Sequence, residues 1–253
     1  MKLHFKKIGS GQPLLIIHGL FGSSDNWGTI GKRFAENHTV YLIDQRNHGH
    51  SNHDEIMNYE AMAEDLMELI NDENINNPIL LGHSMGGKAA MRFTQKFPSV
   101  LAKLIVADIG VKGYPMHHDH IIEGLNSINL NSVKSRGEAT KILANHVKEF
   151  GIQQFLLKNL YWKEKGVLAW RMNIPVIVKN MSSILGELPN VVSKTKTLFL
   201  RGEKSNYILE SDFENINDVF TNSTFETIYN AGHWLHAENP NDFYNMVSEF
   251  IEN

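Results

Sequence analysis

The strongest structural signal in the chain is a ten-residue segment that reads Ile79-Leu80-Leu81-Gly82-His83-Ser84-Met85-Gly86-Gly87-Lys88. A short apolar run leads into a G-x-S-x-G motif formed by Gly82, Ser84 and Gly86, and a helix is predicted over residues 88–96. A serine at a tight turn from strand to helix lies in strained backbone, with its hydroxyl raised above the sheet. Glycines are needed on both sides because a β-carbon there would collide with the neighbouring strand and helix. The segment therefore predicts that Ser84 is a nucleophile.

The same segment nearly matches a second motif, the phosphate-binding loop G-x-x-x-x-G-K-[ST]. Gly82, Gly87 and Lys88 fit this motif, but the next residue is Ala89, so the hydroxyl that binds Mg²⁺ is missing. The segment also follows a middle strand rather than a strand near the start of the domain. A glycine-rich turn with an idle serine is the plainer alternative. The nucleophile remains the favoured interpretation.

Short apolar runs recur along the chain and alternate with helical patterns. Continuous apolar runs are typical of strands buried on both faces, which indicates a mainly parallel sheet. Apolar residues recur at helical spacing over residues 59–71, and Asn239 followed by Pro240 predicts the start of a C-terminal helix. The fold class is therefore α/β, with right-handed crossovers. The predicted strands lie at 14–17, 40–43, 79–81, 104–107, 198–200 and 225–229.

The alternation of strands and helices stops between Asp108 and Thr197. A structureless loop of that length is implausible in a compact domain. Helical patterns occur there instead, at 121–128, 138–150, 152–160 and 174–184. We therefore predict a helical cap at residues 111–195, inserted between the two parts of an α/β core at 1–110 and 196–253. A plain continuation of the sheet is the alternative.

The composition of the chain bounds its class. The 253 residues, 42% of them hydrophobic and 21% charged, suit one large globular domain. A net charge of −4 gives no basic surface for nucleic acid. Cysteine is absent, which excludes disulfides, thiolate catalysis and cysteine-bound metal. No apolar run approaches the length that spans a bilayer, and the first residues lack the apolar core of a signal peptide, so we expect a cytoplasmic location. The oligomeric state stays open.

A serine hydroxyl is a weak nucleophile until a base takes its proton. His233 follows the last predicted strand, in a loop that reaches the same end of the sheet as Ser84. The expected order in the chain is serine, then aspartate or glutamate, then histidine. We therefore predict that His233 is the general base.

The acid that supports the base is predicted to be Asp108, which ends the strand after the nucleophile helix. A buried carboxylate at that end of the sheet can hold the imidazole in the correct tautomer. The loop after the next strand carries Ser205 where an aspartate is otherwise expected, and Ser205 is predicted to accept from His233 or to bridge to it. The alternatives are Asp108 as a loop cap and Glu203 as the true acid.

An oxyanion hole needs two backbone N–H donors. One is predicted at Met85, directly after the nucleophile, and the other in the loop after the first buried strand, at Leu20. Gly19 and Gly22 allow that loop to approach a substrate closely. The loop lacks a complete G-x-G-x-x-G, so a dinucleotide cofactor is not expected.

Three apolar residues, Phe21, Phe155 and Trp234, are the predicted substrate contacts. The run His117-His118-Asp119-His120 suggests a metal site, but a solvated entrance to the cap is the plainer interpretation. We therefore predict neither a metal nor a cofactor.

Five segments gather these candidate residues: HGLFG at 18–22, DQRNHGHS at 44–51, GHSMGGK at 82–88, ADI at 107–109 and AGHW at 231–234. Together they resemble the YbfF-type esterases of the α/β-hydrolase superfamily, and the D-x-R-N-H-G-x-S pattern is the most discriminating of them. The resemblance runs over nearly the whole chain. It implies the α/β-hydrolase fold, with an aspartate after the sixth strand and a serine after the seventh, both near the catalytic histidine. Asp108 and Ser205 occupy those positions.

The resemblance also implies an activity, the hydrolysis of short-chain acyl esters or acyl-CoA thioesters, with a small molecule as the only expected partner. Fold alone does not fix function. Another enzyme of the same fold, such as a carbon–carbon bond hydrolase, a lyase or a perhydrolase, is one alternative. A non-catalytic binding protein is the other.

Overall fold

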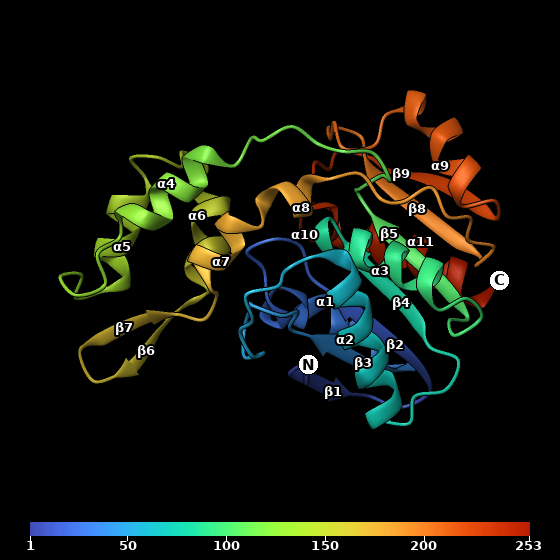
Figure 1. Cartoon of the computed structure of the whole chain (residues 1–253), viewed down its shortest axis with the longest axis horizontal. Coiled ribbons are helices and arrows are strands. Elements are labelled where there is room, and N and C mark those ends of the chain that lie inside the picture. The colour runs from blue at the N-terminus through green and yellow to red at the C-terminus, as the bar shows by residue number, and fades with distance from the viewer.

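The computed structural model describes residues 1–253 and contains a central seven-stranded sheet with helices on both faces (Figure 1). The strands lie side by side in the order β1-β3-β2-β4-β5-β8-β9. Every neighbouring pair is parallel except β1 with β3, which is antiparallel. The bounds are β1 (Phe5–Ile8), β2 (Gln12–Ile17), β3 (His38–Ile43), β4 (Ile79–His83), β5 (Lys103–Ala107), β8 (Thr197–Gly202) and β9 (Ser223–Ile228).

Alternate side chains of each strand enter two different apolar layers. In β2, Leu14 and Ile16 pack in the layer that contains Phe243, whereas Leu15 and Ile17 pack in the layer that contains Phe93. Burial on both faces explains why the strands are continuously apolar. The first layer holds the helices α1 (Gly28–Phe34), α10 (Leu235–Glu238) and α11 (Pro240–Glu252), and the second holds α2 (Tyr59–Asp72), α3 (Met85–Lys96) and α9 (Phe213–Val219).

The six strands predicted from apolar runs are confirmed, as are the helix at 59–71 and the α/β class. The Asn239 side chain accepts a hydrogen bond from the Asp242 N–H at 3.3 Å, so it caps α11 as expected. Strand β1 was not predicted, because its sequence, Phe-Lys-Lys-Ile, has no continuous apolar run. It lies at the sheet edge, where only one neighbour and little burial are required.

Between β5 and β8 the chain leaves the sheet and forms a separate group of elements, most of them at the left of Figure 1. We call residues 111–195 the cap segment. Its two ends lie side by side, since Leu188 N donates to Val111 O and Tyr114 N donates to Leu185 O. The elements are α4 (Asp119–Ser127), α5 (Arg136–Leu143), α6 (Phe150–Leu157), β6 (Leu160–Glu164), β7 (Val167–Trp170), α7 (Ile174–Lys179) and α8 (Met181–Leu185).

The prediction of a helical cap is wrong in one place. Strands β6 and β7 form an antiparallel hairpin, and α6 ends at Leu157 although a helix was predicted to continue to residue 160. The turn of the hairpin contains Gly166 with φ +83°, a conformation that glycine adopts readily. The predicted helix at 138–150 is also shorter, because α5 ends at Leu143. None of the helices combines the length and the apolar character that crossing a membrane requires.

Close packing explains the glycines around Ser84. A β-carbon on Gly82 would lie 2.3 Å from Gly86 O, and one on Gly86 would lie 2.6 Å from the carbonyl oxygens of Ile17 and His18. Helix α3 thus lies against the end of β2 at a distance that only glycine permits. This agrees with the collision expected from the motif.

We predict that Gly86→Ala lowers the free energy of unfolding by about 1–3 kcal/mol or more, because the obstructing atoms are rigid backbone. Gly137→Ala is the matched control. Gly137 lies in α5 with only Ser135 Oγ near its open side, at 3.8 Å, so alanine there should stabilise the protein by about 0.5–1 kcal/mol. Urea denaturation of both variants measures the two changes. Equal stability of the two variants would contradict the packing explanation.

Candidate active site

Ser84 lies at the sharp turn between β4 and α3, with φ 52° and ψ −120°. A non-glycine residue in this region is strained by about 1–3 kcal/mol, and such strain persists only where the surroundings enforce it. The turn is held by hydrogen bonds on both sides, from Ser84 N to Ala107 O and from Lys88 N to Ser84 O. The serine side chain is therefore presented at the carboxyl end of the parallel strands.

His233 reaches the serine from the loop between β9 and α10. Its Nε2 lies 3.0 Å from Ser84 Oγ, and its Nδ1 lies 2.8 Å from Asp108 Oδ2. A carboxylate can only accept, so Nδ1 carries the proton and Nε2 is free to accept the hydrogen of the serine hydroxyl. The three predicted residues thus form one continuous chain of hydrogen bonds.

Asp108 is fully buried and its carboxylate has several donors. Oδ1 accepts from Gly202 N at 3.0 Å, and Oδ2 accepts from both His233 Nδ1 and the Ser205 hydroxyl. A buried charge needs such partners, since burying it without them is costly. Glu203, the alternative acid, instead accepts from Asn230 N on the exposed side of its loop.

Two expectations about this loop need correction. Ser205 was predicted to accept from His233 or to bridge to it. Its hydroxyl makes no direct hydrogen bond with the imidazole but donates to Asp108 Oδ2, the oxygen that also accepts from His233 Nδ1, so it reaches His233 only through the carboxylate. The strand numbers also differ, because Asp108 follows the fifth strand of the sheet in chain order and Ser205 follows the sixth. Five strands of the sheet precede Asp108, one fewer than the six that the resemblance implies.

Two residues that position His233 were missed. The Tyr207 ring stacks on the imidazole, with ring centroids 3.8 Å apart, and its hydroxyl bonds to His117 Nε2 in the cap segment. His83 Nε2 donates to the backbone oxygen of His233 at 2.8 Å. Burial holds the pKa of His83 well below its usual range, so this donor is a neutral imidazole. Of these two residues, only His83 lies within a motif identified in the sequence, as the x before the serine in G-x-S-x-G.

The predicted oxyanion loop is held by the D-x-R-N-H-G-x-S segment. Gln45 Nε2 donates to His18 O at 2.8 Å, and Phe21 N donates to His48 Nε2 at 3.2 Å. Burial lowers the pKa of His48 to about 3, so Nε2 remains an acceptor near neutral pH. Asp44 Oδ1 accepts from Ser24 N at 2.6 Å, which fixes the next turn.

The two predicted oxyanion donors have free backbone N–H groups of the right kind. Leu20 N donates to no acceptor in the protein. Met85 is the first residue of α3, where an N–H has no partner within the helix and the helix dipole favours negative charge. Both residues border the space beside Ser84.

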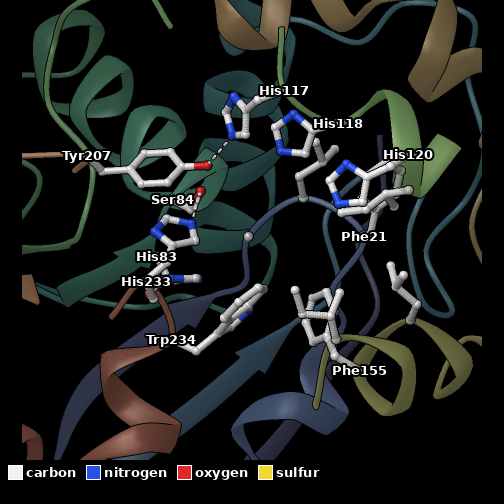
Figure 2. A pocket seen from close by; sticks show the side chains of 15 residues that line it. Phe21, His83, Ser84, His117, His118, His120, Phe155, Tyr207, His233 and Trp234 are labelled. Atoms are coloured by element: carbon white, nitrogen blue, oxygen red, sulfur yellow. Dashed lines mark hydrogen bonds between the residues drawn. The ribbon is translucent and has the colours of Figure 1, made fainter. Parts of the chain in front are cut away.

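A cavity of about 160 Å³ opens in front of Ser84 and His233 (Figure 2). The three predicted substrate contacts, Phe21, Phe155 and Trp234, all line it. His117, His118 and His120 line it as well, so this run belongs to the wall of the site. Burial lowers the pKa of His118 to about 4. No three side chains of the protein are arranged to hold a metal ion.

Lys88, the residue that raised the phosphate-loop alternative, does not line the cavity. Its buried ammonium donates to Lys112 O at 2.6 Å and to Gly186 O, at the two ends of the cap segment. It also lies over the Tyr114 ring, 5.0 Å from the centroid. Lys88 therefore connects the nucleophile helix with both ends of the cap segment.

Lys88 should also make stability depend on pH. Burial lowers its pKa to about 8, whereas an unfolded lysine titrates near 10.4, so the unfolded chain binds more protons between these two values. The free energy of unfolding therefore gains a rising contribution from about pH 8 to about pH 10. We predict that Lys88→Met removes this contribution. Denaturation of both proteins at pH 7, 8, 9 and 10 checks it, and parallel pH curves would contradict it.

Comparison with known proteins agrees with the fold. The family model for the alpha/beta hydrolase fold matches residues 12–130. "Putative esterase/lipase" of Haemophilus influenzae is 38% identical, over 94% of this chain and 82% of that one. "Esterase YbfF" of Escherichia coli is 34% identical, over 94% and 92%. The solved structure "Marine microorganism esterase" superposes with a TM-score of 0.96 at 43% identity, over 98% and 99%.

The architecture and these similarities define an α/β-hydrolase that acts on esters. The chain belongs to the YbfF-type esterases of that superfamily, and its enzyme class is carboxylic ester hydrolase.

Proposed function

We propose that the protein cleaves short-chain acyl esters or acyl-CoA thioesters through an acyl-enzyme on Ser84. The observation that carries this proposal is the unbroken hydrogen-bond chain from Ser84 through His233 to the buried Asp108, at the floor of a cavity. Such a chain turns a weak serine nucleophile into a reactive one.

In the proposed first step, Ser84 Oγ attacks the acyl carbon while its proton moves to His233 Nε2. Asp108 stabilises the resulting imidazolium, and the N–H groups of Leu20 and Met85 hold the negative oxygen. His233 then gives the proton to the departing alkoxide or thiolate as the bond to the acyl carbon breaks. Water repeats the sequence on the acyl-enzyme and frees Ser84.

We assign different roles to the two parts of the chain. Residues 1–110 and 196–253 form the catalytic core, and the cap segment at 111–195 covers the cavity. The cap segment contributes Phe155 and the three histidines to its wall, while Trp234 and Phe21 come from the core. Substrate choice should therefore change most with substitutions in the cap segment.

A kinetic screen tests the proposal. Acyl chains of increasing length are presented on one alcohol and on coenzyme A, and rapid mixing follows release of the leaving group. With activated esters, whose acylation is faster than deacylation, we expect a burst that approaches the enzyme concentration, because the acyl-enzyme accumulates. Absence of turnover with every activated ester and thioester would overturn the proposal. It would favour another reaction of the same fold, such as carbon–carbon bond cleavage.

A further inference from the structure

Ser84 borders two cavities of very different size. The larger is the cavity of about 160 Å³ in Figure 2, and the smaller has a volume of about 20 Å³. Leu20, Ser84, His118 and Tyr207 border both. The larger cavity is also bordered by His233, which is absent from the smaller one, whereas Met85 borders only the smaller.

The position of His233 decides which part of an ester enters which cavity. When the bond between the acyl carbon and the leaving oxygen or sulfur breaks, the electron pair stays on the leaving atom. That atom takes the proton that His233 Nε2 received from Ser84. The leaving atom must therefore face His233, so the leaving group lies in the larger cavity. The acyl substituent is left with the smaller cavity, beside both predicted oxyanion donors.

The smaller cavity is apolar and holds few atoms. A cavity of about 10–15 Å³ holds one water molecule. The smaller cavity, of about 20 Å³, therefore has room for one or two carbon atoms. The walls are mainly aliphatic and aromatic, and they include Ile109, Ile184 and Leu185.

The tyrosine hydroxyls around the smaller cavity and the nearby lysine ammonium are already engaged. The Tyr59 hydroxyl donates to Ile184 O at 2.6 Å, and the Tyr114 hydroxyl donates to Tyr207 O at 2.8 Å. The Lys88 ammonium, behind Tyr114, is bound to two backbone oxygens. His118 also borders this cavity and its Nδ1 has no hydrogen-bond partner, but burial lowers the pKa of its imidazole to about 4, so it is neutral near pH 7. No cation therefore remains to pair with a charged acyl substituent, and burying a carboxylate without a partner is costly.

The leaving-group side is larger and opens outward. Ile152, Phe155 and Trp234 border both the larger cavity and a cleft of about 470 Å³ along α6 and α10. The rings of Phe155 and Trp234 stand 6.0 Å apart at this junction. Polar residues, among them Glu149, Lys158 and Glu238, line the cleft beyond it. A bulky leaving group therefore has space that the acyl group lacks.

We propose that this enzyme selects a small uncharged acyl group, of acetyl or propionyl size, bound in the smaller cavity, and accepts a bulky alcohol or thiol in the larger one. The proposal rests on the proposed function, since it assumes attack by Ser84. Acyl selectivity is set by Leu185 and its neighbours, and leaving-group selectivity is set by Phe155.

Two substrate series test the assignment in the intact protein. The acyl series is 1-naphthyl acetate, butyrate, hexanoate and monosuccinate, and the alcohol series is methyl, benzyl and 1-naphthyl acetate. In the unmodified protein, kcat/KM should fall about tenfold or more from acetate to hexanoate, as expected for methylenes that a pocket excludes. The monosuccinate should be hydrolysed less well than the butyrate.

Four variants, one of them a control, test where the selectivity lies. Leu185→Ala enlarges the smaller cavity and should raise kcat/KM for the hexanoate about tenfold relative to the acetate. Phe155→Ala should change the order in the alcohol series and leave the acyl order unchanged. Leu209→Ala, at an exposed leucine outside both cavities, is the matched control and should change neither. Leu185→Val is a milder second variant, with a smaller shift in the same direction.

The opposite pattern overturns the inference. If Phe155→Ala widens the acyl range while both Leu185 variants leave it unchanged, the acyl group lies in the larger cavity. Preference for the monosuccinate over the butyrate would also overturn it. Both results require ester hydrolysis and therefore leave the proposed function intact. If the unmodified protein hydrolyses none of these esters, the proposed function itself is overturned.

Discussion

Replacing Ser84 with alanine is expected to lower kcat by about 10⁶-fold, which is the loss found when such a nucleophile is removed from a serine hydrolase. No other hydroxyl can take over its task. The Ser205 hydroxyl is committed to Asp108, and the Tyr207 hydroxyl is bonded to His117. Alanine also lacks only one atom, so the fold should change little.

Steady-state rates on an activated acetate ester measure this loss. Ser248→Ala, in the middle of α11 and remote from the cavity, is the matched control and should keep full activity. Near-normal turnover by the Ser84→Ala protein would refute Ser84 as the nucleophile. Circular dichroism confirms that both variants are folded, so a loss of activity can be assigned to chemistry.

Replacing Asp108 with asparagine is expected to lower kcat by about 10⁴-fold, as in other triads whose acid is converted to its amide. The carboxylate accepts from His233 Nδ1, from the Ser205 hydroxyl and from Gly202 N. An amide has one acceptor oxygen and one NH₂ donor. When the NH₂ group faces Nδ1, that nitrogen must accept, and the proton moves to Nε2. The histidine then has no lone pair for the Ser84 hydrogen.

Glu203→Gln is the matched control for Asp108→Asn, because it makes the same chemical change in the alternative acid. Glu203 Oε2 accepts only from the Asn230 backbone, so its amide should retain activity within a few-fold of the unmodified protein. We would measure kcat and KM for both on one acetate ester. A severe loss in Glu203→Gln, with little loss in Asp108→Asn, would move the role of the acid to Glu203.

The sheet was predictable because strands that are buried on both faces are continuously apolar in sequence. Runs such as 14–17 and 104–107 are apolar throughout, and each became a parallel strand. Strand β1 and strand β6 of the β6–β7 hairpin are not apolar throughout. They are exposed on at least one side, so Lys and Glu are tolerated along them. Gly166 was the one turn signal that pointed to the hairpin.

The candidate site was predictable only as far as chain order and strand ends define it. Ser84, Asp108 and His233 each follow a parallel strand, and the carboxyl ends of parallel strands meet at one edge of the sheet. The stacking of Tyr207 on His233 and the bond from Ser205 to Asp108 depend on how one loop folds back. Spacing along the chain carries no information on such contacts. The two cavities depend on packing between distant segments in the same way.

Activation of Ser84 by His233 is the step on which the proposed mechanism depends most, and covalent labelling measures it directly. The protein is incubated with a fluorophosphonate and digested, and the modified peptide is identified by mass spectrometry. We predict one phosphonate per chain, on Ser84, with labelling abolished in Ser84→Ala, strongly slowed in Asp108→Asn and prevented by excess substrate. Labelling of a different residue, or a Ser84 that is no more reactive than Ser248, would contradict the account.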